Sequence, residues 1–318
     1  MLYPKAIRIL YMGTPEYAIA PLKALCDGGY TVVGVVTQPD KPQGRGYVLQ
    51  ETPVKRYALE RGLAVYQPLS LKKKKFAALL EALQPELIIV TAYGKLLPPS
   101  VLQFPRYGCM NLHGSLLPKY RGAAPMQRVL IDGEAETGVT VMAMDEGLDT
   151  GDMLYRIATQ IADSDNFETI HDRLTALSAE ALLHALELLG QDALIPEKQD
   201  DRESCYAAKI TREDCVLHFD ESARALHNRI RGLSPIPLSF ARLNGRMLKI
   251  VEAHVIEEDG VHDCPGEVVS VTGGEIAVLC GTGVLGITGV LPEGKKRMTA
   301  GAFINGRGVK PGDRFEQA

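Results

Sequence analysis

Short apolar runs alternate with amphipathic segments along the first half of the chain. Four of these runs lie at 7–12, 31–38, 86–91 and 108–113. They are rich in Val, Ile, Leu and Met and end at glycine, proline or polar residues, which is typical of buried strands. A helical pattern fills 15–27, with Thr14 as its expected cap and Pro15 at its first position. Strand, helix and strand in succession predict a parallel sheet.

The pattern changes in the second half of the chain. Positions 166–189 carry Phe, Ile and Leu at helical spacing, which predicts a long amphipathic helix. Residues 190–208 lose this periodicity and gain charge, so we interpret them as a linker. Beyond them, a helix at about 221–231 precedes short strand-like runs with glycine turns, which predict a small β-barrel or sandwich. We therefore predict an α/β domain at 1–189, with a doubly wound, mostly parallel sheet, and a small β-barrel domain at 209–318.

Composition narrows the class of protein. Hydrophobic residues make up 46% of the 318 residues and charged residues 23%, as in ordinary globular domains that bury sizeable cores. The formal net charge of −4 excludes a global basic field, so a nucleic-acid partner would need a local basic patch. The six cysteines form no C-x-x-C pair and no Cys/His metal spacing, so we expect reduced thiols and no bound metal.

The N-terminal letters MLYPKAIRILYMG pass almost at once into a strand. They show neither an apolar signal core nor the composition of a transit peptide. No apolar run in the chain is long enough to cross a membrane. We therefore expect a cytoplasmic protein without a membrane partner, and we expect it to be a monomer.

The turn after the first strand argues against dinucleotide binding. Its letters GTPEYA hold one glycine where the fingerprint needs G-x-G-x-x-G, and no acidic residue ends the second strand. After that strand, residues 39–53 are rich in proline and glycine and include Lys41 and Arg45. They are too polar for a core and predict a long exposed loop, which is either functional or only solvated.

Three polar residues within 111–153 are candidates for shared chemistry. Asn111 and His113 end a strand-like run, and residues two apart on a strand point to the same face, roughly 6.5–7 Å apart. The carboxyl end of a strand is where open α/β sheets place ligands. Asp149 follows another strand-like run, and a carboxylate beside an imidazole orients it. Amide, imidazole and carboxylate suit acyl transfer without a covalent intermediate, whereas a lone histidine at a strand end is often only structural.

The letters around these residues resemble the signatures of the folate-dependent formyltransferases. NLHGSLLP followed by RGAAP is similar to one signature, and TGVT with MDEGLDTGD is similar to the second. The opening MGTPEYA, the loop TQPDKPQGRG and the segment VTAYGKLLP resemble the family members that formylate methionine on initiator tRNA. The resemblance covers the whole chain. It implies a Rossmann-like formyltransferase domain, a linker and a C-terminal barrel of the OB type.

The resemblance also implies roles for individual residues. Asn111, His113 and Asp149 would be the catalytic trio, with 10-formyltetrahydrofolate as formyl donor and the α-amino group of methionine on initiator tRNA as acceptor. No metal is implied. The residues implied to bind the folate are Ser115, Leu116, Leu117, Pro118, Ala92, Tyr93, Gly94 and Leu96. The residues implied to bind the tRNA are Lys41, Arg45, Lys209, Arg229 and Arg231.

Several alternatives come from the same family. A formyltransferase acting on an amino-sugar nucleotide would share the trio but should lack the loop 39–53 and the barrel, and a formyltetrahydrofolate hydrolase would use water as acceptor. A transformylase of purine synthesis would be about one domain long, so the length and the linker argue against it. A folate- or RNA-binding module would be the non-enzyme alternative. The division of proton transfer between His113 and Asp149 is also open.

One segment departs from the family, which tends to have a tryptophan in an N-P-W-P-like segment. Here the segment reads SPIP, the chain has no tryptophan, and we interpret Ile236 as an altered packing residue.

Overall fold

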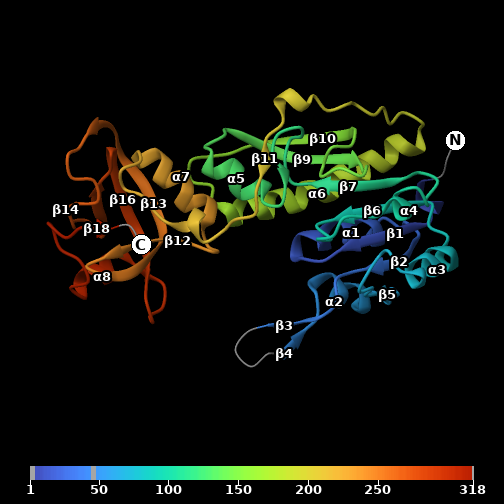
Figure 1. Cartoon of the computed structure of the whole chain (residues 1–318), viewed down its shortest axis with the longest axis horizontal. Coiled ribbons are helices and arrows are strands. Elements are labelled where there is room, and N and C mark those ends of the chain that lie inside the picture. Colours follow the sequence, from blue (N-terminus) through green and yellow to red (C-terminus); the bar gives the residue numbers. More distant parts are fainter. Residues whose placement is uncertain (1–3, 44–47, 317–318) are drawn as a thin grey trace. The chain divides into compact units, whose positions relative to one another are not determined.

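The computed structural model describes residues 4–43 and 48–316 (Figure 1). By its internal contacts the chain divides into two compact units. The first unit comprises Met1–Gly122, Thr137–Thr159 and His171–Tyr206. The second unit comprises Ala123–Glu136, Gln160–Ile170 and Ala207–Ala318.

Strands and helices are interspersed up to residue 207. The strands are β1 (Ile9–Gly13), β2 (Val32–Val36), β3 (Lys41–Gln43), β4 (Val48–Gln50), β5 (Val65–Tyr66), β6 (Leu87–Thr91), β7 (Cys109–His113), β8 (Arg121–Gly122), β9 (Glu136–Ala143), β10 (Met153–Gln160) and β11 (Tyr206–Ala207). The helices are α1 (Ile19–Asp27), α2 (Pro53–Glu60), α3 (Lys74–Leu83), α4 (Pro99–Leu102), α5 (Pro125–Ile131) and α6 (Phe167–Gly190). Short 3₁₀ turns lie at Pro4–Ala6, Glu16–Ala18 and Asp201–Glu203.

The main sheet of the first unit has the strand order β10-β9-β7-β6-β1-β2-β5. β1 pairs in parallel with β2 and β6, and β7 and β5 extend the sheet in parallel on either side. β9 runs antiparallel to β7. Every position of β1, β6 and β7 is buried, which explains their continuous apolar runs, because a parallel sheet is covered on both faces. The predicted mostly parallel sheet is therefore confirmed.

Helices cover both faces of this sheet, as a doubly wound fold requires. On one face, alternate strand residues share a core with α3 and α4, which contains Leu10, Met12, Ile88, Val90, Phe76, Leu80 and Val101. Tyr11 points to the opposite face, since side chains alternate along a strand. Its hydroxyl donates to the Ala18 carbonyl, just before α1, at 2.6 Å. On α6, the His184 ring contacts the Tyr155 ring of β10 at 4.5 Å between centroids.

One local prediction in the first unit was wrong, and a second was incomplete. Thr14 does not cap a helix, because a 3₁₀ turn at Glu16–Ala18 precedes α1. Its hydroxyl donates instead to the Tyr93 carbonyl at 3.1 Å, across to the loop after β6. The predicted long loop also contains two short strands, since β3 and β4 pair antiparallel with Lys41 opposite Gln50.

The second unit is built around an antiparallel sheet. Its strands are β12 (Ser239–Leu243), β13 (Arg246–Val261), β14 (Val268–Ser270), β15 (Ile276–Leu279), β16 (Thr282–Pro292), β17 (Met298–Thr299) and β18 (Phe315–Glu316). Its helices include α7 (Ala223–Leu233) and α8 (Ala300–Asn305), and a 3₁₀ turn lies at Glu213–Cys215. The strand order is β14-β15-β16-β13-β12-β18, and β17 pairs with β16.

Backbone hydrogen bonds join the two ends of this sheet. Val268 N donates to the Asp313 carbonyl, and Phe315 N donates to the Gly266 carbonyl, both at 2.8 Å. The curled sheet encloses a core that includes Leu226 and Ile230 of α7. The predicted small β-barrel is confirmed. Ile236 is 71% exposed, so the interpretation of this residue as a packing residue was wrong.

The segment 190–208 makes regular contacts with the first unit. Met153 and Glu197 exchange a pair of backbone hydrogen bonds, each 2.8 Å long. Farther along, Arg121 N donates to the Cys205 carbonyl at 3.0 Å, next to the pairing of β8 with β11. The segment therefore runs against β10 and β8 before it reaches the second unit. No helix in the described part of the chain has the length and apolar character needed to span a membrane.

Candidate active site

β7 carries Asn111 and His113 into one buried place. Asn111 pairs with Val90 of β6 and Met142 of β9, and His113 pairs with Thr140 of β9. Because the two residues are two apart on the strand, their side chains point to the same face. They are 9% and 6% exposed. The predicted shared face at the carboxyl end of a strand is thus present in the structure.

The contacts of His113 distinguish its two ring nitrogens. Nε2 lies 2.8 Å from the carbonyl oxygen of Tyr120. A carbonyl only accepts hydrogen bonds, so Nε2 carries a hydrogen and donates it. Nδ1 faces Asp149, with 3.6 Å between Nδ1 and Oδ2, which is longer than a hydrogen bond. Nδ1 is therefore the nitrogen that is free to gain or lose a proton beside the carboxylate.

Asp149 is held on a turn whose backbone is in the left-handed region, with φ of +54°. Aspartate tolerates this region better than most residues. Its Oδ2 accepts a hydrogen bond from Gly122 N at 2.9 Å, and its own carbonyl accepts one from Gln199 Nε2, also at 2.9 Å. The side chain is 15% exposed. The structure thus brings all three residues of the predicted trio together within the first unit.

Asn111 has no side-chain hydrogen bond to any residue in 4–43 or 48–316. Its amide atoms keep some contact with solvent, so water can satisfy them until a ligand takes its place. Such a group suits a ligand that supplies the missing partner. The amide can donate through Nδ2 and accept through Oδ1.

The buried Thr140 side chain holds the turn Ser115–Pro118 through two hydrogen bonds. The Thr140 hydroxyl donates to the Ser115 carbonyl at 2.7 Å and accepts from Leu117 N at 3.1 Å. Ser115 Oγ donates to the Lys119 carbonyl at 2.8 Å. Leu117 packs in a small core with Met142 and Met153. Ser115 and Leu117 thus have structural contacts of their own, and a role of this turn in folate binding stays a prediction.

The loop after β6 presents a mixture of buried and exposed residues. Ala92 and Gly94 have φ of +47° and +83°, and both are exposed. Between them, Tyr93 is buried, and burial raises the pKa of its hydroxyl to about 12. The Tyr93 carbonyl accepts from Gln38 Nε2 at 3.0 Å, which ties this loop to the end of β2. Leu96 is 68% exposed, so this apolar side chain faces solvent in the structure.

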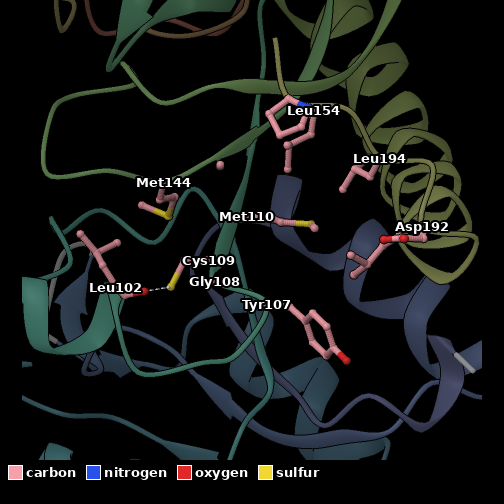
Figure 2. Close-up of a pocket in the computed structure, with 12 residues that line it drawn as sticks. Leu102, Tyr107, Gly108, Cys109, Met110, Met144, Leu154, Asp192 and Leu194 are labelled. Atoms are coloured by element: carbon pink, nitrogen blue, oxygen red, sulfur yellow. Dashed lines mark hydrogen bonds between the residues drawn. The ribbon is translucent and has the colours of Figure 1, made fainter. Parts of the chain in front are cut away.

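A cavity of about 310 Å³ lies at the start of β7 (Figure 2). Its mostly apolar lining includes Leu102, Cys109, Met110, Met144, Leu154 and Leu194. In Figure 2, Cys109 and Met144 lie on one side of β7, and Met110 points to the side of Leu194. His113 is four residues away along β7, or about 13 Å. The residues predicted to bind folate do not line this cavity, and sequence reasoning did not identify it.

The basic residues predicted to bind tRNA have very different surroundings. Lys41 and Lys209 are exposed, and Arg45 lies outside the described residues. Arg229 forms two hydrogen bonds with the Glu221 carboxylate, at 2.7 and 3.0 Å. Arg231 is 9% exposed and donates to the Asn228 side chain and to the Ala162 carbonyl. Arg229 and Arg231 thus bind groups of their own unit, so their surroundings favour a structural role over phosphate binding.

Sequence reasoning missed the residues that support the trio. Tyr120 and Gly122 act through backbone groups, which carry no side-chain signal. Gln199 lies 50 residues from Asp149, and nothing in its local sequence indicates the contact. Arg121 lies in the RGAAP run and could have been noticed there. No cluster of three or more His, Cys, Asp or Glu residues suited to a metal ion occurs in the described ranges.

Comparisons with known proteins cover nearly the whole chain. A family model described as "Formyl transferase" matches residues 5–186, and one described as "Formyl transferase, C-terminal domain" matches residues 209–308. The chain is 44% identical over 306 residues to a "Methionyl-tRNA formyltransferase" of Citrifermentans bemidjiense, covering 96% of this chain and 95% of that protein. It is 46% identical over 307 residues to one of Caldanaerobacter subterraneus subsp. tengcongensis, covering 96% and 99%.

Solved structures with low sequence identity share the fold. HypX from Aquifex aeolicus, solved with tetrahydrofolic acid, has a TM-score of 0.63 at 17% identity and covers 96% of this chain and 48% of its own. An N-formyltransferase from Helicobacter canadensis, solved with folinic acid and dTDP-3-aminofucose, has a TM-score of 0.65 at 17% identity, with 88% and 98% covered. These two matches bear on the fold alone. From the family models and the sequence relatives it follows that the chain belongs to the methionyl-tRNA formyltransferase family.

Proposed function

We propose that this protein transfers the formyl group of 10-formyltetrahydrofolate to the α-amino group of methionine esterified to initiator tRNA. The observation that carries the proposal is the identity of 44–46%, over about 96% of the chain, to relatives named methionyl-tRNA formyltransferase. The buried group formed by Asn111, His113 and Asp149 supports it, because acyl transfer to an amine needs both an oxyanion donor and a proton carrier.

Asn111 is the proposed oxyanion donor. When bound, 10-formyltetrahydrofolate supplies the formyl group as a substrate. The leaving group is the folate nitrogen that carried the formyl group. The Asn111 amide fits a donor site because it is nearly buried and lacks a partner among the residues described. Its Nδ2 hydrogens can stabilise the negative oxygen that develops at the formyl carbon. Loss of one such donor typically costs about 2.7–4 kcal/mol of transition-state stabilisation.

His113 and Asp149 are the proposed proton carriers. Since Nε2 donates to the Tyr120 carbonyl, the proton exchanged during reaction is the one on Nδ1. The Asp149 carboxylate, 3.6 Å away, stabilises the positive imidazolium ring. Nδ1 can thus take the proton that the attacking amine loses and return it to the leaving nitrogen. Both transfers use the nitrogen that faces Asp149, and we assign Asp149 the role of stabilising the charged ring.

Folate binding is proposed for the turn Ser115–Pro118 and for the loop Ala92–Leu96. The cavity at the start of β7 is not part of this proposal, because none of these residues lines it and it lies about 13 Å from His113. The exposed side chain of Leu96 would pack against the folate on binding, which would account for an apolar side chain that faces water in the structure.

For the tRNA, we propose contacts at the β3–β4 hairpin and in the C-terminal domain 209–318, with 190–208 as the connection. Lys41, Arg45 and Lys209 are the proposed phosphate ligands. Cations that neutralise phosphates release counterions, so the affinity should fall as salt rises. Arg229 and Arg231 are not part of the proposal, since their guanidinium groups already have partners.

An assay of the purified protein tests the proposal directly. The protein is incubated with 10-formyltetrahydrofolate and methionine-charged initiator tRNA, and the expected product is formylmethionyl-tRNA. Uncharged tRNA is the control. Formylation of an amino-sugar nucleotide in preference to the charged tRNA, or release of formate without an acceptor, would support the corresponding alternative and overturn the proposal.

A further inference from the structure

One glutamine side chain forms hydrogen bonds with the turn that carries Asp149. Gln199 Nε2 donates to the Asp149 carbonyl at 2.9 Å and to the Gly151 carbonyl at 2.7 Å. Gln199 Oε1 accepts from Arg121 Nε at 2.9 Å. The amide thus binds two carbonyls of the turn and the side chain of Arg121 in β8 at once.

The orientation of this amide follows from the chemistry of its partners. Two carbonyls can only accept, so they require the NH₂ group, and a guanidinium can only donate, so it requires the oxygen. The reversed orientation would place oxygen against two carbonyl oxygens. Every hydrogen bond that the Gln199 amide makes here is therefore specific to a glutamine in this rotamer.

Arg121 links Gln199 to the segment that binds the Asp149 carboxylate. Its neighbour Gly122 donates from its backbone nitrogen to Asp149 Oδ2 at 2.9 Å. Arg121 therefore holds Gln199 with its side chain, while the next residue holds the Asp149 carboxylate. Gln199 thus holds the backbone of Asp149, and Gly122 holds its carboxylate. The φ of +54° at Asp149 is a sparsely populated conformation that needs such support.

We propose that Gln199 is a positioning residue that holds the Asp149 carboxylate against Nδ1 of His113. This inference rests on the proposed function and extends it to a side chain outside the trio. Asp149 Oδ2 is already 3.6 Å from Nδ1, so a small outward movement of the turn weakens the support of the charged ring. A displacement of about 1 Å in an active site can cost a factor of about 100 in rate.

The test compares kcat and KM of Gln199→Leu with those of the wild-type protein, using 10-formyltetrahydrofolate and charged initiator tRNA. Leucine keeps the approximate size of glutamine and removes the three hydrogen bonds. The expected result is a kcat reduced roughly 10- to 100-fold, with KM for the tRNA changed by less than about threefold. Gln199→Glu, which keeps the acceptor for Arg121 and loses the donors, is a second variant with the same expected direction. Exposed Lys198→Ala is the matched control and should keep the wild-type kcat.

A double variant separates positioning from general stability. In an Asp149→Asn background, Gln199→Leu should reduce kcat by less than about threefold, because the charge that it positions is already absent. An unchanged kcat in folded Gln199→Leu and Gln199→Glu would overturn the inference, and so would a full second reduction in the Asp149→Asn background. Failure of the proposed function is a separate result, in which wild-type protein yields no formylmethionyl-tRNA.

Discussion

Replacing Asp149 by asparagine separates the charge of this side chain from its shape. Asparagine also tolerates the left-handed backbone region, where Asp149 has φ of +54°. Its Oδ1 can still accept the hydrogen bond from Gly122 N, which is 2.9 Å long with aspartate. The variant should therefore fold normally and lack only the negative charge beside His113.

The distance between the two groups sets the size of the effect. At 3.6 Å, and with an effective dielectric constant of about 20, opposite unit charges attract by about 4–5 kcal/mol. His113 and Asp149 are 6% and 15% exposed, so screening by solvent is small. This attraction lowers the barrier only of the step in which the His113 imidazole is positively charged. The full attraction corresponds to a factor of roughly 1,000 or more in kcat, because about 1.36 kcal/mol corresponds to a factor of ten, and we expect a loss of that order.

The assay measures formylmethionyl-tRNA in single-turnover conditions with saturating formyl donor, so that product release does not limit the rate. Asp152→Asn is the matched control, since it makes the same chemical change at the end of the same turn. Circular dichroism and thermal unfolding check that both variants fold. A rate for Asp149→Asn within about threefold of the wild-type rate would refute the argument, because a loss of that size corresponds to less than about 1 kcal/mol.

Three further predictions concern other residues. His113→Ala should lower formyl transfer by roughly 100-fold or more while tRNA affinity, measured by filter binding, stays within about twofold; near-normal turnover would contradict the assigned role. Arg45→Ala should weaken tRNA binding and reduce the slope of log affinity against log salt by about 0.7–0.9, and an unchanged slope would exclude a phosphate contact. Burial raises the pKa of the Cys109 thiol to about 12, so at about pH 8 iodoacetamide should label exposed Cys205 and spare Cys109 until the protein unfolds; equal labelling in the native state would count against this.

Local patterns in the sequence were sufficient for the frame of the site. The apolar run 108–113 predicted β7, and alternation along a strand predicted that Asn111 and His113 share a face. Both features depend on residues close together in the sequence. The Thr14 cap failed for the opposite reason: the alternative partner of its hydroxyl is the Tyr93 carbonyl, 79 residues away.

Charged and amide side chains were the hardest to interpret from sequence. Arg229 and Arg231 looked like exposed cations, but Glu221 and backbone carbonyls of the same unit bind them in the structure. Gln199 looked like part of a polar linker. The partners of such long side chains come from distant segments, so local composition has little information about them.

The sequence by itself determined the main buried strands, the long helix at 166–189 and the positions of Asn111, His113 and Asp149 on strand ends and turns. It could do so because apolar periodicity and turn residues act over a few neighbouring positions. Only the tertiary structure decided that Nδ1 of His113 faces Asp149, that Gln199 binds the Asp149 carbonyl and that Gly122 binds the Asp149 carboxylate. Those facts depend on hydrogen bonds between segments that folding brings together. Such bonds produce no periodic pattern of residues in the sequence.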